Sequence, residues 1–395
     1  MFTSVHRNPA KTDRLQGIDG LKIIVDQNIR GAEETFGLHG ELQFMEGRLI
    51  SASDVKDADV LIIRTATSVD GSLLEGSSVG FVGTTSIGTD HLDIDWLDRN
   101  GITWSNAPGC NADSAAQYTL AMIWLACERL GKPFYEQRVG IVGRGNVGSR
   151  LERLLQALGL ETLANDPPLA DQGESGLVSL NEVLNCDIVS LHVPLETEGP
   201  YPTMQMIDAR QLSRMAEGAL LVNAARGEVI HGEALLQVLK TGRMNAALDV
   251  WPGEPLFSAD LLQQVVVATP HVGGYSLDGK RNGTDMVYRA FCEWAGIEPL
   301  NPPAGNAPTA GEPELELRIT PGDDPMTCAL EATCFVPHHD EAMRRLVSLS
   351  VEQRADEFDG LRKEYPSRRD FHAWTVRGAD PATAALLARL GFSIG

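Results

Sequence analysis

One stretch of the chain, at residues 139–155, constrains the fold more than any other: VGIVGRGNVGSRLERLL. An apolar, β-branched run leads into a glycine-rich turn, and leucines recur at helical spacing after the turn. In such a turn, Gly143 allows the chain to reverse sharply, Gly145 lets backbone amides approach a pyrophosphate, and Gly148 lets the helix pack on the strand. The amides and the dipole at the start of the helix favour phosphate charge. The stretch therefore predicts the first βα unit of a dinucleotide-binding sheet.

A second apolar run, LETLAND, follows this helix and ends in Asp166, 18 residues after Gly148. An acidic side chain at this place accepts hydrogen bonds from the adenosine ribose hydroxyls. Neither Lys nor Arg occurs from Pro167 to Gln172, so a ribose 2′-phosphate would meet no counterion there. We predict NAD, not NADP, as the cofactor; the alternative is a purely structural glycine turn.

Length and charge narrow the class of protein. A chain of 395 residues is too long for one ordinary core and predicts two or three domains. The net charge of −21 disfavours nucleic acids and anionic membranes as partners. No apolar run approaches the roughly 20 residues that a membrane span needs, and the six scattered cysteines follow no zinc or disulfide pattern. We therefore expect a cytoplasmic protein without a metal site.

Alternating strands and helices predict an α/β fold with two Rossmann-like, doubly wound lobes and a small α+β C-terminal domain. The first lobe shows three buried strands, LKIIVDQN, DVLIIRTAT and GFVGTTSIGTDHLD, each ending in a polar loop. The second lobe is expected to have strands at 139–142, 162–165, 188–192, 220–223, 246–250 and 265–268, after a long helix at 111–130. The predicted parts are a disordered extension (1–20), a substrate-binding lobe (21–112 and 284–298), an NAD-binding domain (113–283), a linker (299–313) and a C-terminal domain (314–395).

The C-terminal domain carries no evident catalytic cluster. It is expected to contain a strand at LELRI, one helix near 340–357 and a closing amphipathic helix in ADPATAALLARLGF. Small domains appended in this way often mediate dimerisation, and we prefer that role to a second active site.

Three strands of the second lobe deliver side chains that suit the oxidation of a 2-hydroxy acid. Arg226 follows the strand LLVN and offers a planar fork that can grip a carboxylate. His271 follows VVVATP, and an imidazole, with its ordinary pKa of ~6.5, can take the hydroxyl proton as hydride leaves. Glu254 can orient that imidazole, and Asp249 is expected near the nicotinamide. Taken singly, each could be a surface or structural residue; their joint occurrence after a dinucleotide motif favours the catalytic interpretation.

These motifs, GRGNVG, NAARG, ALDVWPGEP and TPHVGGY, resemble those of the D-isomer-specific 2-hydroxyacid dehydrogenase family, in its order, over about residues 21–296. The segments SNAPGCNADSAAQY, NDPPLAD, ETEGPYPTM, GGYSLDGKRNGT and EFDGLRKEYPSRRDF further resemble the branch of the family that serves vitamin B6 biosynthesis. That resemblance implies NAD-dependent oxidation of a small phosphorylated 2-hydroxy acid, 4-phospho-D-erythronate, to 3-hydroxy-2-oxo-4-phosphobutanoate by a homodimer.

The resemblance also implies residue roles. It gives catalytic roles to Arg226, Glu254 and His271. It places substrate contacts at Thr65, Ser86 and Tyr275, with Arg64 as a plausible phosphate partner. The predicted cofactor-binding residues are Gly143, Gly145, Asn146, Val147, Gly148, Asp166, Val193, Ala224, Ala225, Asp249 and Gly274.

The chain departs from the family pattern at one cofactor-site position and at one position in the loop that holds Glu254. Val193 stands where relatives often have a hydroxyl residue, and Pro252 stands where they are commonly acidic. Two alternatives stay open: a dehydrogenase of another 2-hydroxy acid, such as 3-phosphoglycerate, and, from a different class, an NAD-sensing, corepressor-like binding protein.

Overall fold

The computed structural model describes residues 20–300, 314–320, 322–365 and 368–395. The described residues form two compact units. The first takes the chain up to Asn111 and again from Leu277, and the second takes Ala112–Ser276 and the described residues from 314 onward. The predicted extension and almost all of the predicted linker lie outside the described residues.

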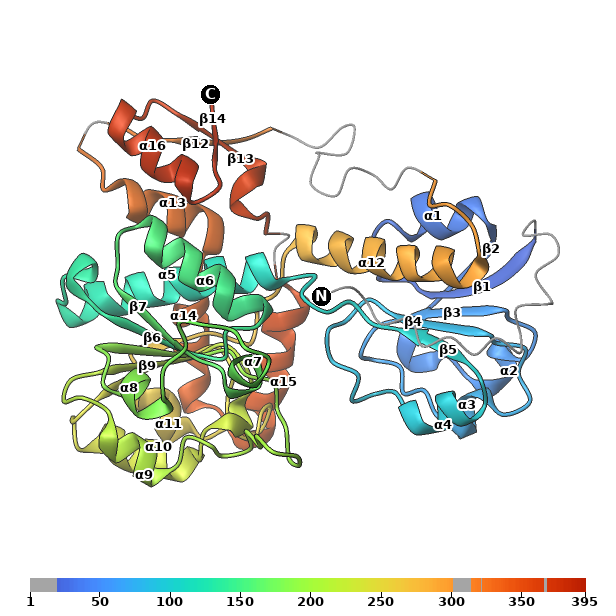
Figure 1. The fold of residues 1–395 in the computed structure, drawn as a ribbon, viewed down its shortest axis with the longest axis horizontal. Coiled ribbons are helices and arrows are strands. Elements are labelled where there is room, and N and C mark those ends of the chain that lie inside the picture. Colours follow the sequence, from blue (N-terminus) through green and yellow to red (C-terminus); the bar gives the residue numbers. More distant parts are fainter. Residues whose placement is uncertain (1–19, 301–313, 321, 366–367) are drawn as a thin grey trace. The chain divides into compact units, whose positions relative to one another are not determined.

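The first unit is built on a parallel five-stranded sheet of order β2-β1-β3-β4-β5, with helices on both faces (Figure 1). Its strands are β1 (Leu21–Asp26), β2 (Gly40–Met45), β3 (Val60–Ile63), β4 (Phe81–Thr84) and β5 (Thr103–Ser105). Its helices are α1 (Ala32–Thr35), α2 (Ala52–Val55), α3 (Gly71–Leu74), α4 (Ile94–Arg99) and α12 (Leu277–Ala295), with 3-10 turns at Phe36–Leu38 and Gly47–Leu49.

Two strands of this sheet, β2 and β5, were not expected from the sequence. β2 is an edge strand with alternating, half-exposed residues, and β5 has only three residues. Neither carries the continuous apolar run that marks a strand covered on both faces. The three predicted strands, by contrast, are the inner strands β1, β3 and β4.

The second unit contains a parallel six-stranded sheet of order β11-β10-β9-β8-β6-β7. The order reverses at β6, as in doubly wound folds, so the predicted α/β architecture is confirmed. Its strands are β6 (Val139–Val142), β7 (Thr162–Asn165), β8 (Ile188–Leu191), β9 (Leu220–Asn223), β10 (Asn245–Leu248) and β11 (Val267–Ala268). Its helices are α5 (Ala112–Leu130), α6 (Asn146–Ala157), α7 (Pro167–Asp171), α8 (Leu180–Leu184), α9 (Ala209–Arg214), α10 (Gly232–Lys240) and α11 (Ala259–Gln264), with 3-10 turns at Phe134–Glu136 and Gly227–Val229.

Helices cover both faces of this sheet. In one buried core, α5 and α6 pack on strand residues such as Val139 and Ile141. In the other, the helices α8, α9, α10 and α11 pack on strand residues such as Val142 and Val189. Figure 1 shows α5 and α6 on one side of the strands and α8, α10 and α11 on the other. The sheet is therefore buried on both faces, as its apolar strands predicted.

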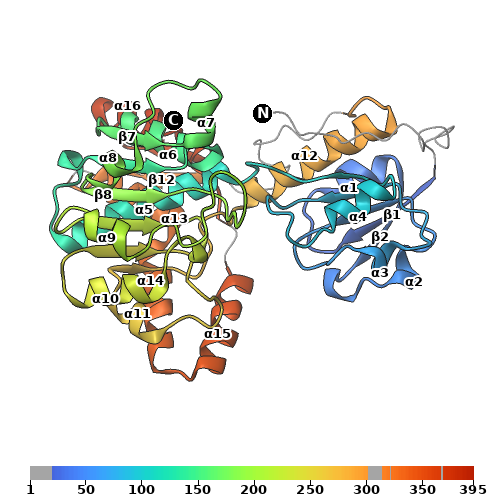
Figure 2. The ribbon, with the colours of Figure 1, turned by 60° about the horizontal axis from the view of Figure 1, so that its bottom comes forward.

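The C-terminal elements are packed onto the second unit. They comprise β12 (Leu315–Arg318), α13 (Pro325–Cys334), α14 (Val336–Arg345), α15 (Val351–Lys363), β13 (Trp374–Arg377), α16 (Pro381–Arg389) and β14 (Ser393–Ile394), with 3-10 turns at Leu346–Ser348 and Phe371–Ala373. The strands form a parallel sheet of order β12-β13-β14. The single helix expected near 340–357 is wrong: Ser350 begins a new helix, α15, through a capping box with Gln353, and Figure 2 shows α14 and α15 as separate helices.

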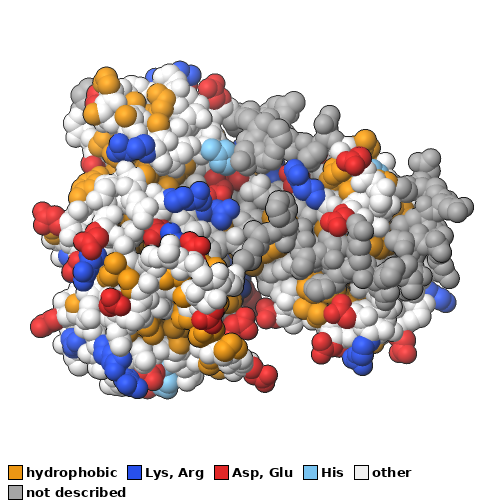
Figure 3. Space-filling view, in the orientation of Figure 1, with side chains coloured by type: hydrophobic (Ala, Val, Ile, Leu, Met, Phe, Trp, Pro, Cys, Tyr) orange, Lys and Arg blue, Asp and Glu red, His pale blue; other side chains and the backbone are white. Residues whose placement is uncertain are grey.

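The charge of the surface and the apolar character of the helices can be compared with what a nucleic acid or a membrane would require. On the face drawn in Figure 3, Lys and Arg side chains are interspersed with Asp and Glu over the described residues. None of the helices in the described part of the chain combines the length and the apolar character that a membrane span requires.

Candidate active site

The glycine-rich turn has the geometry that its sequence predicts. Gly143 has a positive φ of 89°, which side-chain-bearing residues rarely adopt. A Cβ atom at Gly148 would lie 2.0 Å from the carbonyl oxygen of Gly143, so only glycine fits there. A Cβ atom at Gly145 would meet no described atom within 4 Å. The space beside Gly145, at the start of the α6 helix that begins at Asn146, therefore suits a ligand that approaches the backbone.

Asp166 lies at the end of β7 and is held by two backbone amides. Its Oδ2 accepts from the amide of Arg144 at 2.8 Å, and its Oδ1 accepts from Leu169 at 3.1 Å. The nearby Arg144 guanidinium could in principle bind a 2′-phosphate, but it is paired with Glu152 at 2.6 Å and Glu174 at 3.2 Å. Because two carboxylates neutralise this arginine, the site fits the ribose of NAD better than that of NADP.

Four further predicted cofactor residues lie beyond the ends of strands in the same parallel sheet. Val193 follows β8, Ala224 and Ala225 follow β9, and Gly274 lies beyond β11. Val147 packs against the core under the turn. Carboxyl ends of parallel strands meet at one edge, which is where ligands bind in doubly wound sheets. These residues lie on loops at that edge.

Glu254 and His271 are in direct contact, although 17 positions separate them in the sequence. The Nδ1 atom of His271 is hydrogen-bonded to a carboxylate oxygen of Glu254, whose other oxygen accepts from the amide of Trp251 at 3.0 Å. Burial by itself raises the pKa of Glu254, but the hydrogen bond and charge of His271 outweigh it, with help from Trp251 and Arg362, and the pKa lies below its ordinary value. A carboxylate that stays ionised fixes the ring orientation and supports a proton on the imidazole.

The backbone of His271 is strained. Its φ of 55° is in the left-handed region, which costs about 1 kcal/mol or more for a non-glycine residue and is found preferentially at functional sites. Buried Asp249 holds the loop in this shape, because its side chain accepts from Thr269 at 2.7 Å, Val272 at 3.0 Å and Gly273 at 2.9 Å. Since Nδ1 is engaged by Glu254, Nε2 is the ring nitrogen that can accept a substrate proton.

Arg226 is a half-buried cation that has no carboxylate within 4.0 Å among the described residues. Its side chain donates to the carbonyl of Ala225 at 2.8 Å, and the side chain of Asn223 holds its loop by donating to the Arg226 carbonyl at 2.9 Å. The adjacent Gly227 packs directly on Trp251, since a Cβ atom there would lie 2.0 Å from the Trp251 carbonyl oxygen. The loop of Arg226 thus abuts the loop of Glu254. The guanidinium, which meets no carboxylate in the described part of the chain, suits an anionic ligand.

In the first unit, the predicted substrate residues follow adjacent inner strands. Thr65 comes just after β3 and Ser86 just after β4, and the carbonyl of Ser86 accepts from Ala107 at 3.0 Å. Arg64 forms an ion pair with fully buried Asp26, at 3.1 Å. A loop with hydroxyl groups and a fixed guanidinium therefore lies at the carboxyl edge of this sheet.

Sequence reasoning missed Lys280, in the first turn of α12. Burial, followed by the charges of Arg30 and Arg64, lowers the pKa of Lys280, so three cations act on one another in a chain of net charge −21. Like charges gathered at one place are typical of an anion site. The available signal was a basic pair directly after the TPHVGGY motif, in GGYSLDGKR.

His192 and His91 lie among residues that hold their rings in place. Burial lowers the pKa of His192 to about 4, so its ring is neutral, and its Nε2 is hydrogen-bonded to Ser190 at 2.8 Å. The ring of His91 is hydrogen-bonded to Thr84 at 2.9 Å.

Comparison with known proteins identifies the family to which this chain belongs. Residues 111–273 match the family described as D-isomer specific 2-hydroxyacid dehydrogenase, NAD binding domain, and residues 325–391 match a family described only as a domain of unknown function. Together with full-length relatives, this shows that the chain belongs to the D-isomer specific 2-hydroxyacid dehydrogenase family. The predictions of an NAD-dependent dehydrogenase and of NAD as its cofactor are confirmed.

The full-length relatives narrow the similarity further. The erythronate-4-phosphate dehydrogenase of Hahella chejuensis is 40% identical over 381 residues, covering 95% of this chain and 99% of that protein. That of Azotobacter vinelandii is 42% identical over 386 residues, covering 94% and 99%. The NAD-bound 3-phosphoglycerate dehydrogenase of Entamoeba histolytica shares the fold, with a TM-score of 0.60 and 23% identity over 70% of this chain and 95% of that one.

Proposed function

We propose that this chain oxidises 4-phospho-D-erythronate at carbon 2 to 3-hydroxy-2-oxo-4-phosphobutanoate, with NAD reduced to NADH and one proton released. The observation that carries the proposal is the His271–Glu254 pair beside the loop of Arg226, in a chain whose full-length relatives are erythronate-4-phosphate dehydrogenases.

In this mechanism each residue has one task. The glycine-rich turn and Asp166 would hold NAD, which would supply the acceptor for the hydride that leaves carbon 2. Nε2 of His271 takes the proton of the 2-hydroxyl group, and Glu254 stabilises the imidazolium that forms. Arg226 binds the carboxylate of the substrate and polarises the reacting oxygen. In the reverse direction, the protonated His271 returns the proton.

Recognition of the substrate falls to two groups of side chains. Thr65, Ser86 and Tyr275 offer hydroxyl groups for a polyhydroxylated acid. Lys280 provides the positive charge that a phosphate group requires, because a phosphate carries nearly two negative charges at neutral pH. Arg64, whose guanidinium is held by the ion pair with Asp26, offers further N–H donors beside it. Substituting Lys280 by Met is expected to raise KM for the phosphorylated acid while it leaves the affinity for NAD unchanged.

The test is a comparison of 2-hydroxy acids. The chain is given NAD and, in separate reactions, 4-phospho-D-erythronate, 3-phosphoglycerate or D-lactate, and the 2-oxo product is quantified directly. We expect the largest kcat/KM for 4-phospho-D-erythronate. A preference for 3-phosphoglycerate would contradict the substrate and retain the reaction type, whereas no turnover with any acid but tight NAD binding would favour the corepressor-like alternative.

The chain is further proposed to act as a homodimer in the cytosol. The small set of C-terminal elements supports the dimer. The six cysteines, all of them free thiols, support the cytosol. Light scattering on the purified protein should give a mass of twice 42.7 kDa, and a single 42.7 kDa species would contradict the dimer.

A further inference from the structure

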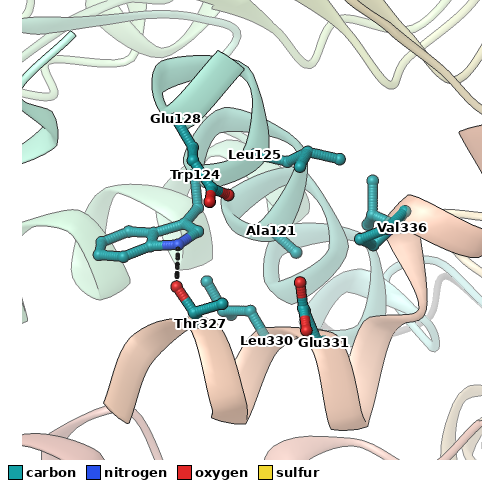
Figure 4. A pocket seen from close by; sticks show the side chains of 9 residues that line it. Ala121, Trp124, Leu125, Glu128, Thr327, Leu330, Glu331 and Val336 are labelled. Carbon is teal, nitrogen blue, oxygen red and sulfur yellow. Dashed lines mark hydrogen bonds between the residues drawn. The ribbon is translucent and has the colours of Figure 1, made fainter. Parts of the chain in front are cut away.

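The C-terminal elements dock on the NAD-binding sheet through α5. Figure 4 shows Trp124 and Leu125 of α5 facing Thr327 and Leu330 of α13 across a small pocket, with the indole nitrogen of Trp124 donating to Thr327 at 3.1 Å. Buried residues of the two parts belong to one continuous apolar core. The C-terminal elements are therefore integral to the second unit.

Arg368 and Asp340, two residues of these elements, form hydrogen bonds with the segment that carries His271. Arg368, which is fully buried, donates from Nη2 to the carbonyl of Gly273 at 2.8 Å and from Nε to the carbonyl of Tyr275 at 3.1 Å. Asp340 of α14 accepts from the amide of Ala268, at the end of β11, at 2.7 Å. The segment that carries His271 is thus held at both ends by residues of the C-terminal elements.

Arg362, on α15, reaches the functional side chains themselves. Its Nη2 donates to the hydroxyl group of Tyr275 at 3.3 Å, and its guanidinium lies 5.9 Å from the centre of the Tyr275 ring. Phe358 packs on the guanidinium at 5.8 Å, and Asp359 lies 3.6 Å from it. With a side chain only 28% exposed, this arginine is fixed by packing as well as by charge.

The charge of Arg362 also acts on the catalytic pair. Burial lowers the pKa of Arg362, but Tyr275, Glu254 and Asp359 outweigh it and raise the pKa, so the guanidinium stays charged. In return, Arg362 contributes to the low pKa of Glu254. Among the largest influences on the pKa of Glu254, the charged or titratable side chains are His271, beyond β11, and Arg362, on α15.

We propose that Arg362 is a positioning residue of the active site, which orients the hydroxyl group of Tyr275 and sets the charge balance of the Glu254–His271 pair. The C-terminal elements, whose residues 325–391 match a family described as a domain of unknown function, thereby complete the catalytic site of their own chain. This inference rests on the proposed function, since it assigns a further residue to the same site.

The inference predicts the direction of a pH shift. Without the positive charge of Arg362, the Glu254 carboxylate stabilises a protonated imidazole more strongly, and the apparent pKa of the coupled pair rises. Oxidation requires the neutral imidazole. The acidic limb of kcat/KM for oxidation therefore moves to higher pH, by about 0.5–1 unit for a partly solvated charge.

Four variants separate positioning from folding. Arg362→Gln should move the acidic limb upward and raise KM for the hydroxy acid, with the dissociation constant of NAD unchanged. Arg362→Lys should restore the limb, because it keeps the charge, but not the low KM, because it lacks the fork that reaches Tyr275. Tyr275→Phe should raise KM without moving the limb. Arg345→Gln, the matched control on α14, removes an exposed arginine paired with Glu341 and should behave as the parent protein.

A substrate-free measurement keeps the two proposals distinguishable. Histidine ring resonances are titrated by NMR, with His271 assigned by the signal that is lost in His271→Asn. In Arg362→Gln the midpoint of that signal should rise in step with the kinetic limb. Absent turnover of 4-phospho-D-erythronate by the parent protein would remove the proposed function and leave this titration valid. Equal midpoints and equal KM in Arg362→Gln and the parent protein would overturn the role of Arg362.

Discussion

The cofactor turn at residues 143–148 and the catalytic loop at residues 269–276 follow strands of the same sheet, but different contacts hold them. In the turn, the Cβ position of Gly148 is filled by the carbonyl oxygen of Gly143, five positions away, and the other contacts come from residues at the ends of two neighbouring strands, namely Asn165, Asp166 and His192. In the loop, the partners come from other parts of the chain, namely Asp249, Arg362 and Arg368, and Asp340 holds the end of the preceding strand β11. The binding turn is thus fixed by its own glycines and by two neighbouring strands of the sheet, whereas the catalytic loop also depends on the C-terminal elements.

The largest effect is expected at the catalytic loop. His271→Asn should lower turnover by about 10²–10⁴-fold, the usual contribution of a general base. Asn tolerates the left-handed backbone at this position, so the loop should keep its shape. Steady-state kinetics, with NAD titrated by fluorescence as a check on the cofactor site, measure the effect. Turnover within tenfold of the parent protein would remove His271 from the chemistry.

A pair of glycine variants tests the cofactor turn. Gly148→Ala places a Cβ atom 2.0 Å from a carbonyl oxygen, so the turn must move, and the free energy of unfolding should fall by about 1–3 kcal/mol. Gly145→Ala meets open space, so unfolding should be unchanged while NAD affinity falls on the order of tenfold, because the pyrophosphate loses its close approach. Denaturant unfolding and NAD titration of the two variants measure these effects. Equal unfolding free energies for the two variants would contradict the packing role of Gly148.

The ribose contact should have a smaller effect. Asp166→Asn loses charge-assisted hydrogen bonds to the ribose and should raise KM for NAD roughly tenfold, corresponding to about 1.5 kcal/mol. NADP should gain little, because Glu152 and Glu174 neutralise Arg144. Asp171→Asn, at the exposed end of α7, makes the same change in net charge and serves as the control. Equal KM values for NAD in both variants would contradict the assignment.

The smallest effect concerns the docking of the C-terminal elements on α5. Burial, with smaller contributions from His338 and Arg368, lowers the pKa of His339 to about 3, and the ring is hydrogen-bonded to Tyr118 at 2.8 Å. Below the ordinary imidazole pKa, the unfolded chain binds a proton that the folded chain does not. Stability therefore falls with falling pH, by about 1–2 kcal/mol between about pH 7 and about pH 5.

The variant His339→Asn should show a shallower pH dependence of the free energy of unfolding. His231→Asn is the matched control, because this exposed histidine caps α10 and Asn caps helices well. If the free energy of unfolding depends on pH in His339→Asn as it does in the parent protein, His339 is not the cause of that dependence.

The sequence predicted those parts of the site whose constraints are local. Continuous apolar runs identified the inner strands, and the spacing of Gly143, Gly145 and Gly148 identified the cofactor turn. Arg226, Glu254 and His271 could be selected because each follows a strand or lies in a motif. β2 and β5 were missed because short, half-exposed edge strands lack an apolar run, and the break between α14 and α15 was missed because its signal is a single capping residue, Ser350.

The sequence by itself determined the sheet, the turn that suits a dinucleotide, and the residues able to move a proton. Only the tertiary structure decided that Glu254 meets His271, that Asp249 holds the strained loop, and that Arg362 reaches Tyr275. The physical reason is the range of the forces involved. Backbone sterics and apolar periodicity act over a few residues, whereas ion pairs and buried hydrogen bonds join groups more than 80 positions apart, such as Arg362 and Tyr275, that only packing brings together.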